Sequence, residues 1–119
     1  MSGVDLHIHS SVSDGVLSPA GVVARAAESG LTAISLTDHD NVDGIAPALE
    51  AAGNYPNLTF IPGIELNTDT RTGEIHILGY YIDHTDPELL GTLQHLRDSR
   101  LRRAQKMIKK LSEMGMPID

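Results

Sequence analysis

The first residues of the chain that could do chemistry are two histidines one residue apart, with an aspartate shortly after them. His7 and His9 belong to a short apolar run, and Asp14 follows among serines and a glycine. If residues 4–9 form a β-strand, its period of two places Asp5, His7 and His9 on one face. The turn-forming composition around Asp14 lets this side chain reach back over the strand end. The segment therefore predicts the first half of a metal site.

Three more candidate ligands lie downstream, each in a predicted strand or directly after one: His39, Glu65 and His76. An isolated strand histidine is usually structural or on the surface, but histidines and carboxylates gathered from several elements are typical of a metal site. The chain has no cysteine, so the ligands would be nitrogen and oxygen atoms, which suit zinc, manganese or iron. A carboxylate such as Glu65 can bridge two cations. Three aspartates are expected to orient the imidazoles by accepting their other N–H groups: Asp5, Asp38 and Asp40.

The elements that must position these residues alternate between strand and helix. The apolar patterns predict strands at 4–9, 32–36, 58–66 and 74–82, a helix from Pro19 to just before Gly30, and a helix at 42–52. We expect the third strand to break at Pro62 and Gly63, residues 67–73 to form a turn, and the fourth strand to return antiparallel. Polar residues 37–40 directly follow a buried strand, where α/β folds carry their chemistry.

A long amphipathic helix is predicted from Asp86 to near Gly115. Its apolar residues recur at spacings of three to five, and its other face is basic: Arg97, Arg100, Arg102, Arg103, Lys106, Lys109 and Lys110. A solvated face with ion pairs and a phosphate-binding face both agree with this pattern. Arg100 and Arg103, one turn apart, are the candidates for phosphate binding, because a guanidinium can bind phosphate through two hydrogen bonds.

The bulk composition excludes several classes of protein. A chain of 119 residues is too short for two cores, and none of its apolar runs approaches the roughly 20 residues that cross a bilayer. The absence of a signal-peptide pattern favours a cytoplasmic location. A net charge of −7 and an aromatic content of 3% argue against binding of long duplex DNA. The expected partners are therefore a phosphorylated small molecule, a nucleotide or a nucleic-acid end.

Four motifs together resemble the polymerase and histidinol phosphatase (PHP) family of metal-dependent phosphoesterases. They are Asp5-Leu-His-Ile-His-Ser, Thr37-Asp-His-Asp, Gly63-Ile-Glu and His76-Ile-Leu-Gly-Tyr. The resemblance implies an α/β fold: here the N-terminal half of a distorted (β/α)7 barrel, with about four strands in residues 1–85. It also implies two or three divalent cations: His7, His9 and Glu65 would bind the first, Glu65 and His76 the second, and Asp14 and His39 the third.

The long helix and its flanks look most similar to the family branch that hydrolyses nucleoside 3′,5′-bisphosphates and trims the 5′ end of short RNA. In that branch, residues 86–119 would begin an inserted substrate-recognition region. The family pattern continues with a further histidine and an Asp-x-His motif, which do not follow His76 in this sequence. We therefore expect an incomplete cation site, and association with a C-terminal half. Unpaired sheet edges and the exposed leucines of the long helix also predict self-association. The alternatives are a non-catalytic metal-binding or interaction module, a histidinol-phosphate phosphatase and a polymerase-associated PHP domain.

Overall fold

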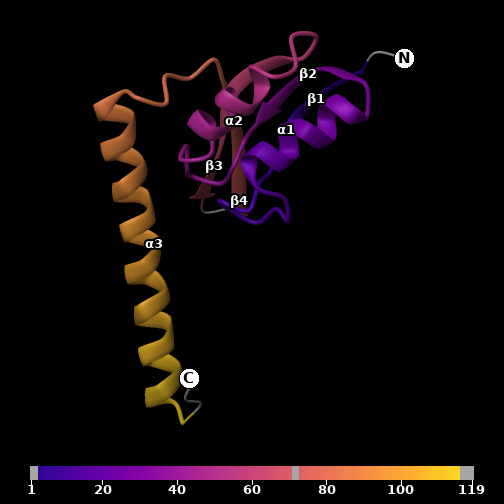
Figure 1. The fold of residues 1–119 in the computed structure, drawn as a ribbon. Coiled ribbons are helices and arrows are strands. Elements are labelled where there is room, and N and C mark those ends of the chain that lie inside the picture. The colour runs from indigo at the N-terminus through magenta and orange to yellow at the C-terminus, as the bar shows by residue number, and fades with distance from the viewer. Residues whose placement is uncertain (1–2, 71–72, 116–119) are drawn as a thin grey trace. The chain divides into compact units, whose positions relative to one another are not determined.

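The computed structural model describes residues 3–70 and 73–115, and it contains four strands and three helices in these ranges. In chain order they are β1 (Gly3–Ile8), α1 (Pro19–Glu28), β2 (Leu31–Leu36), α2 (Ile45–Ala52), β3 (Thr59–Thr70), β4 (Gly73–Tyr80) and α3 (Pro87–Glu113). Contacts divide the chain into two compact units, with the boundary between Asp86 and Pro87. The first unit contains the sheet, and the second contains α3 (Figure 1).

The four strands form one mixed sheet in the order β1-β2-β3-β4. β1, β2 and β3 are parallel, and β4 returns antiparallel to β3 as the expected hairpin. α1 and α2 connect the parallel strands and lie together against β2 and β3 (Figure 1). The buried apolar side chains come from both layers: Val22, Val23, Ala26, Ile34, Leu36, Ile45 and Ala48. Because α1 and α2 cover one face, the other face of this half-barrel is left for polar side chains.

The predicted start of α1 is confirmed in detail. Ser18 has an extended backbone, and its Oγ accepts a hydrogen bond from the Gly21 amide, 3.0 Å away. Pro19 then occupies the first helical position, where no intrahelical amide bond is needed. Past the other end, Gly30 adopts a φ of +80°, a conformation that glycine tolerates best.

α2 begins later than the apolar pattern predicts. It starts at Ile45, with Gly44 at its N-cap, whereas the sequence placed the start at Val42. The Ile45 amide donates to the Val42 carbonyl, so the preceding residues form a turn. Pro47 consequently falls in the first turn of the helix, where its missing amide hydrogen costs nothing.

The expected break of β3 at Pro62 and Gly63 is wrong, and so is the expected turn beginning at Asn67. β3 runs without interruption from Thr59 to Thr70. Pro62 is the last residue paired with β2, and Gly63 is the first paired with β4. A proline is tolerated there because the strand changes partner at this point, and the Pro62 carbonyl still accepts from the Tyr81 amide at 2.8 Å. Asn67 is therefore a strand residue, paired with His76.

α3 is confirmed as a single long helix, and Gly115 follows it with a φ of +82°. Apolar side chains on this helix are exposed, including Leu101, Met107 and Ile108. None of the described helices has both the length and the apolar character that a membrane span requires.

Candidate metal centre

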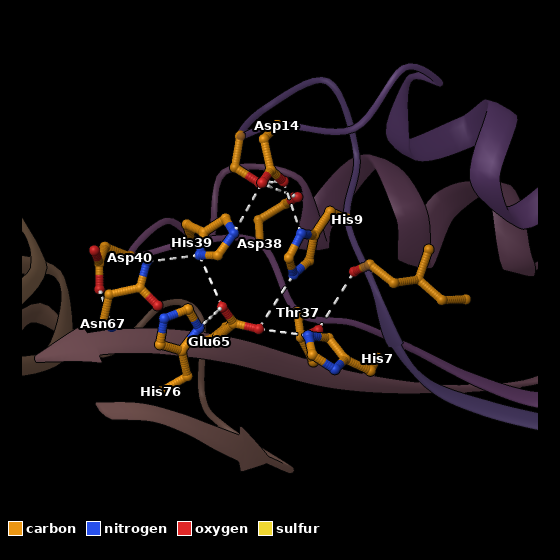
Figure 2. A network of polar contacts seen from close by, with 12 residues as sticks. His7, His9, Asp14, Thr37, Asp38, His39, Asp40, Glu65, Asn67 and His76 are labelled. Atoms are coloured by element: carbon orange, nitrogen blue, oxygen red, sulfur yellow. Dashed lines mark hydrogen bonds and ion pairs between the residues drawn. The ribbon is translucent and has the colours of Figure 1, made fainter. Parts of the chain in front are cut away.

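Four imidazoles surround the carboxylate of Glu65, whose side chain is only 2% exposed (Figure 2). His7 Nε2 contacts Oε1, and His9 Nε2 lies 3.4 Å from the same oxygen. His39 Nδ1 and His76 Nδ1 lie 2.9 and 3.0 Å from Oε2. The sequence-predicted residues from β1, from the end of β2, from β3 and from β4 thus come together at one carboxylate.

Backbone pairing explains why Glu65 reaches the end of β2. Residues 38–40 continue beyond β2 and form a parallel bridge with β3, pairing His39 with Glu65. The Glu65 amide donates to the Asp38 carbonyl at 3.0 Å, and the Asp40 amide donates to the Glu65 carbonyl at 2.9 Å. These two hydrogen bonds fix the His39 side chain beside the Glu65 carboxylate.

Asp14 supplies a second carboxylate from the loop after β1. Its Oδ1 lies 2.7 Å from His9 Nδ1, and its Oδ2 lies 3.0 Å from His39 Nε2. The Asp14 side chain is 62% exposed, in contrast to that of Glu65. Asp14 therefore lies on an exposed side of the cluster, as do His7 and His76.

His9 and His39 each lie between the same two carboxylates, Asp14 and Glu65. A neutral imidazole carries one N–H hydrogen, so it can donate to only one of them. A protonated imidazole donates to both carboxylates, whereas the second nitrogen of a neutral one directs a lone pair at a carboxylate oxygen, and a cation between these two atoms would relieve that repulsion. His9 Nε2 illustrates this, because it is buried without a hydrogen-bond partner among the described residues.

The donor set satisfies what a divalent cation requires. The ligand atoms of His7, His9 and Glu65 lie within 4.8 Å of one another, and so do those of His9, Asp14 and His39. Imidazole nitrogen with carboxylate oxygen is the mixed set that zinc, manganese and iron accept. A cation in either group would replace the repulsion between lone pairs with attraction. The residues present therefore fit a divalent cation.

The histidines lower the pKa of both carboxyl groups. Desolvation raises the pKa of Glu65, but the hydrogen bond with His7 and the charges of His39, His9 and His7 outweigh it, so the pKa lies below its usual value. For Asp14 desolvation again raises the pKa, and the hydrogen bonds and charges of His9 and His39 reverse the effect. Both side chains are thus held in the ionised form that binds cations.

His76 is the histidine whose pKa is raised. Desolvation lowers this pKa, but hydrogen bonds to Glu74 and Glu65 and the charges of these two residues raise it by more. The pKa of His76 therefore lies above its usual value. His76 Nε2 lies 3.5 Å from Glu74 Oε1, on the side of the ring away from Glu65. Glu74 is therefore a carboxylate neighbour that sequence reasoning did not single out.

Asp38 holds the loop that carries Asp14. Its Oδ1 accepts from the Ser10 amide at 2.6 Å and from Ser13 Oγ at 2.8 Å, and its Oδ2 accepts from Ser10 Oγ at 2.7 Å. Asp38 and Ser10 are both buried. These hydrogen bonds go to the loop and not to an imidazole, so Asp38 positions Asp14 indirectly.

The other two aspartates also bind backbone amides. Asp5 Oδ1 accepts from the His7 amide at 3.1 Å, and the buried Asp40 accepts from the Asn67 amide at 3.3 Å. The side-chain Nδ2 of Asn67 lies 2.8 Å from His39 Nδ1. Asn67 thus contacts a candidate ligand, although its turn-like sequence context gave no signal for it.

Arg100 and Arg103, the candidates for phosphate binding, both lie on α3. α3 belongs to the second compact unit, whereas the cluster around Glu65 belongs to the first.

Comparison with protein families matches the chain to the PHP domain over residues 5–96. A 3′,5′-nucleoside bisphosphate phosphatase of Chromobacterium violaceum is 38% identical over 116 residues, covering 98% of this chain and 40% of that protein. The 5′-3′ exoribonuclease Rnm of Escherichia coli is 39% identical over 114 residues, covering 95% of this chain and 39% of that protein. The chain thus spans about two fifths of the length of these curated relatives.

Two solved structures have a similar fold. An amidohydrolase from Chromobacterium violaceum, with bound sulfate and no metal, has a TM-score of 0.82 at 37% identity and covers 98% of this chain and 40% of its own. A Bifidobacterium adolescentis protein described as a metal-dependent phosphoesterase has a TM-score of 0.80 at 29% identity, covering 94% of this chain and 39% of its own.

Proposed function

The chain belongs to the PHP domain family, and we propose that it is a metal-dependent phosphoesterase acting on a phosphate ester of a nucleotide or of RNA. The observation that carries this proposal is the placement of His9 and His39 between two carboxylates, Asp14 and Glu65. At a pH where these imidazoles are neutral, a cation between an imidazole nitrogen and a carboxylate oxygen makes this placement favourable.

The six predicted ligands have distinct places in this proposal. His7, His9 and Glu65 would hold one cation, Glu65 and His76 a second, and Asp14 and His39 a third. The contacts of all four imidazoles with Glu65 support its role as the shared ligand.

Divalent cations at such a site lower the pKa of a bound water and polarise phosphoryl oxygens during in-line attack. The residues of the chain supply the geometry for this chemistry. Glu65 is buried and fixed by backbone pairing, so it provides a rigid base for the cluster. Asp14, His7 and His76 are exposed, so a phosphate would reach the cluster from the sides that these residues form. In a chain with a net charge of −7, cations also offset the repulsion of an anionic substrate.

The substrate class is proposed from the relatives. Those named above are a nucleoside 3′,5′-bisphosphate phosphatase and a 5′-3′ exoribonuclease, which act on nucleotides and on RNA ends. Arg100 and Arg103 on the basic face of α3 are proposed to contact substrate phosphates, because guanidinium groups bind phosphate bidentately.

A substrate panel with a matched variant tests the proposal. The chain is loaded with manganese or zinc and incubated with adenosine 3′,5′-bisphosphate, a short 5′-phosphorylated RNA and histidinol phosphate, and released phosphate and nucleotides are measured. Because the cation site of this chain is expected to be incomplete, we expect slow turnover of the first two substrates. His9→Ala should abolish this turnover, and His95→Ala on α3 should retain it. Cation binding without turnover of any substrate would favour a non-catalytic binding module. Turnover of histidinol phosphate alone would overturn the substrate class.

A further inference from the structure

His39 has a neighbour that the proposed function does not yet use. Its Nε2 faces Asp14 at 3.0 Å, and on the opposite side of the ring Nδ1 faces the side-chain amide of Asn67 at 2.8 Å. Figure 2 shows Asn67 beside the ring, on the side away from Asp14. Asn67 thus lies where a group that orients a metal-binding imidazole is expected to lie.

Asn67 is itself held firmly from two directions. Its backbone amide donates to Oδ1 of the buried Asp40, and it is paired with His76 across the hairpin. Asp40 adopts a φ of +47°, and its amide is bonded to the Glu65 carbonyl. The backbone of Asn67 is therefore fixed to the same bridge that places His39 beside Glu65.

We infer that Asn67 is a positioning residue for His39, whose Nδ1–H it accepts so that the Nε2 lone pair points toward Asp14. This inference rests on the proposed function, because it concerns a cation held between His39 and Asp14. In the structure the amide nitrogen Nδ2 faces His39 Nδ1. The inference takes the other orientation of this amide, in which a rotation by half a turn brings the oxygen Oδ1 to the same place. Glu65 Oε2 also lies 2.9 Å from Nδ1, but its oxygens serve the cations in the proposed site. Asn67 is then the acceptor that remains for the Nδ1 hydrogen.

Two substitutions at Asn67 and one elsewhere test this role. Asn67→Leu removes the acceptor at nearly constant size, Asn67→Asp keeps an acceptor, and Asn57→Leu makes the same change at an exposed turn residue before β3. Zinc affinity is measured by competition with a chromophoric chelator. We expect Asn67→Leu to lose affinity by about tenfold to a hundredfold, and Asn67→Asp and Asn57→Leu to bind zinc at least as well as the unchanged chain.

Nuclear magnetic resonance of the zinc-loaded chain gives a readout that a purely structural role would not change. The His39 Nδ1–H proton should be protected from exchange in the unchanged chain and in Asn67→Asp, and should exchange rapidly in Asn67→Leu. Circular dichroism checks that each variant is folded. If Asn67→Leu is unfolded, the zinc affinity and the His39 proton exchange of Asn67→Asp test the inference.

The outcomes separate this inference from the proposed function. Equal zinc affinity and a protected His39 proton in Asn67→Leu would overturn the inference, and so would a loss of affinity in Asn67→Asp. Failure of the unchanged chain to bind zinc or manganese would overturn the proposed function instead.

Discussion

Tyr80 Oη donates a hydrogen bond to the backbone carbonyl of Leu6 at a distance of 2.7 Å. Tyr80 ends β4 and Leu6 lies in β1, and these strands are at opposite edges of the four-stranded sheet. The contact is possible because the sheet curves until its two edges approach each other. It connects the strand that carries His7 to the strand that carries His76.

Replacing Tyr80 with phenylalanine removes only this hydroxyl. We expect Tyr80→Phe to lower the free energy of unfolding by about 1 kcal/mol, the typical net contribution of one hydrogen bond. Urea denaturation measures the change, with Tyr81→Phe as control, because the Tyr81 side chain is largely exposed. An equal loss of stability in the two variants would contradict a specific role for the Tyr80 hydroxyl.

Asp38→Ala should destabilise the chain more than Tyr80→Phe does. The substitution leaves the Ser10 amide and Ser10 Oγ without their acceptor in a buried position, so we expect a loss of about 3 kcal/mol. Urea denaturation gives the free energy, and limited proteolysis of residues 10–15 reports on the loop. Resistance of this loop to cleavage in Asp38→Ala would show that other contacts hold Asp14.

Gly63 is required by the close approach of β2 and β3. A Cβ atom at this position would lie 2.4 Å from Ser35 Oγ, 2.8 Å from Thr37 Cγ2 and 3.0 Å from the Gly79 carbonyl oxygen. We expect Gly63→Ala to cost about 1 to 3 kcal/mol, as overpacked substitutions do. Gly91→Ala is the control, because nothing lies within 4 Å of the added atom in α3. Thermal unfolding measures the stability of both variants. If Gly63→Ala were as stable as the unchanged chain, this packing would be contradicted.

The sequence pattern predicted the main ligands because they depend on local periodicity. The period of two in β1 places His7 and His9 on one face, and the structure brings both to Glu65. His39 and Glu65 were predictable as candidate ligands because each lies near the end of a buried apolar run, where polar residues begin. The half-barrel of four strands, also expected from the family resemblance, agrees with the solved relatives. Whether these residues bind cations stays a prediction.

Contacts between distant segments could not be predicted from local pattern. Asn67 lies in a segment whose composition favours a turn, but pairing with β4 extends β3 through it. The hydrogen bonds of Asp38 depend on the path of the loop after β1, and the Tyr80 contact depends on the curvature of the sheet. In each case tertiary structure overrides a local preference.

Asp83 should make the stability of the chain sensitive to acid. Hydrogen bonds from the Thr85 hydroxyl and amide lower the pKa of Asp83 from its usual value of 3.8. Because the folded state favours the ionised form, this stabilisation is present above pH 3.8 and is lost as the pH falls through the lower folded-state pKa. Urea denaturation between about pH 2 and pH 5 should show a weaker acid dependence for Asp83→Asn than for the unchanged chain. Thr85→Val keeps the amide donor, so it should give an intermediate dependence, and a slope unchanged in both variants would refute the assignment.

Glu65→Gln should remove the shared ligand while preserving its shape. The buried carboxylate contacts all four imidazoles of the cluster, so a neutral amide there loses the charge that two cations would share. We expect the affinity for zinc to fall by more than about a hundredfold, beyond the usual effect of changing a residue that only supports a ligand. Since a bound ligand stabilises the folded state, zinc should raise the thermal unfolding temperature of the unchanged chain but not that of Glu65→Gln. Glu50→Gln, an exposed substitution on α2, is the control and should respond to zinc as the unchanged chain does. Equal stabilisation of Glu65→Gln by zinc would mean that the cation is held without this carboxylate.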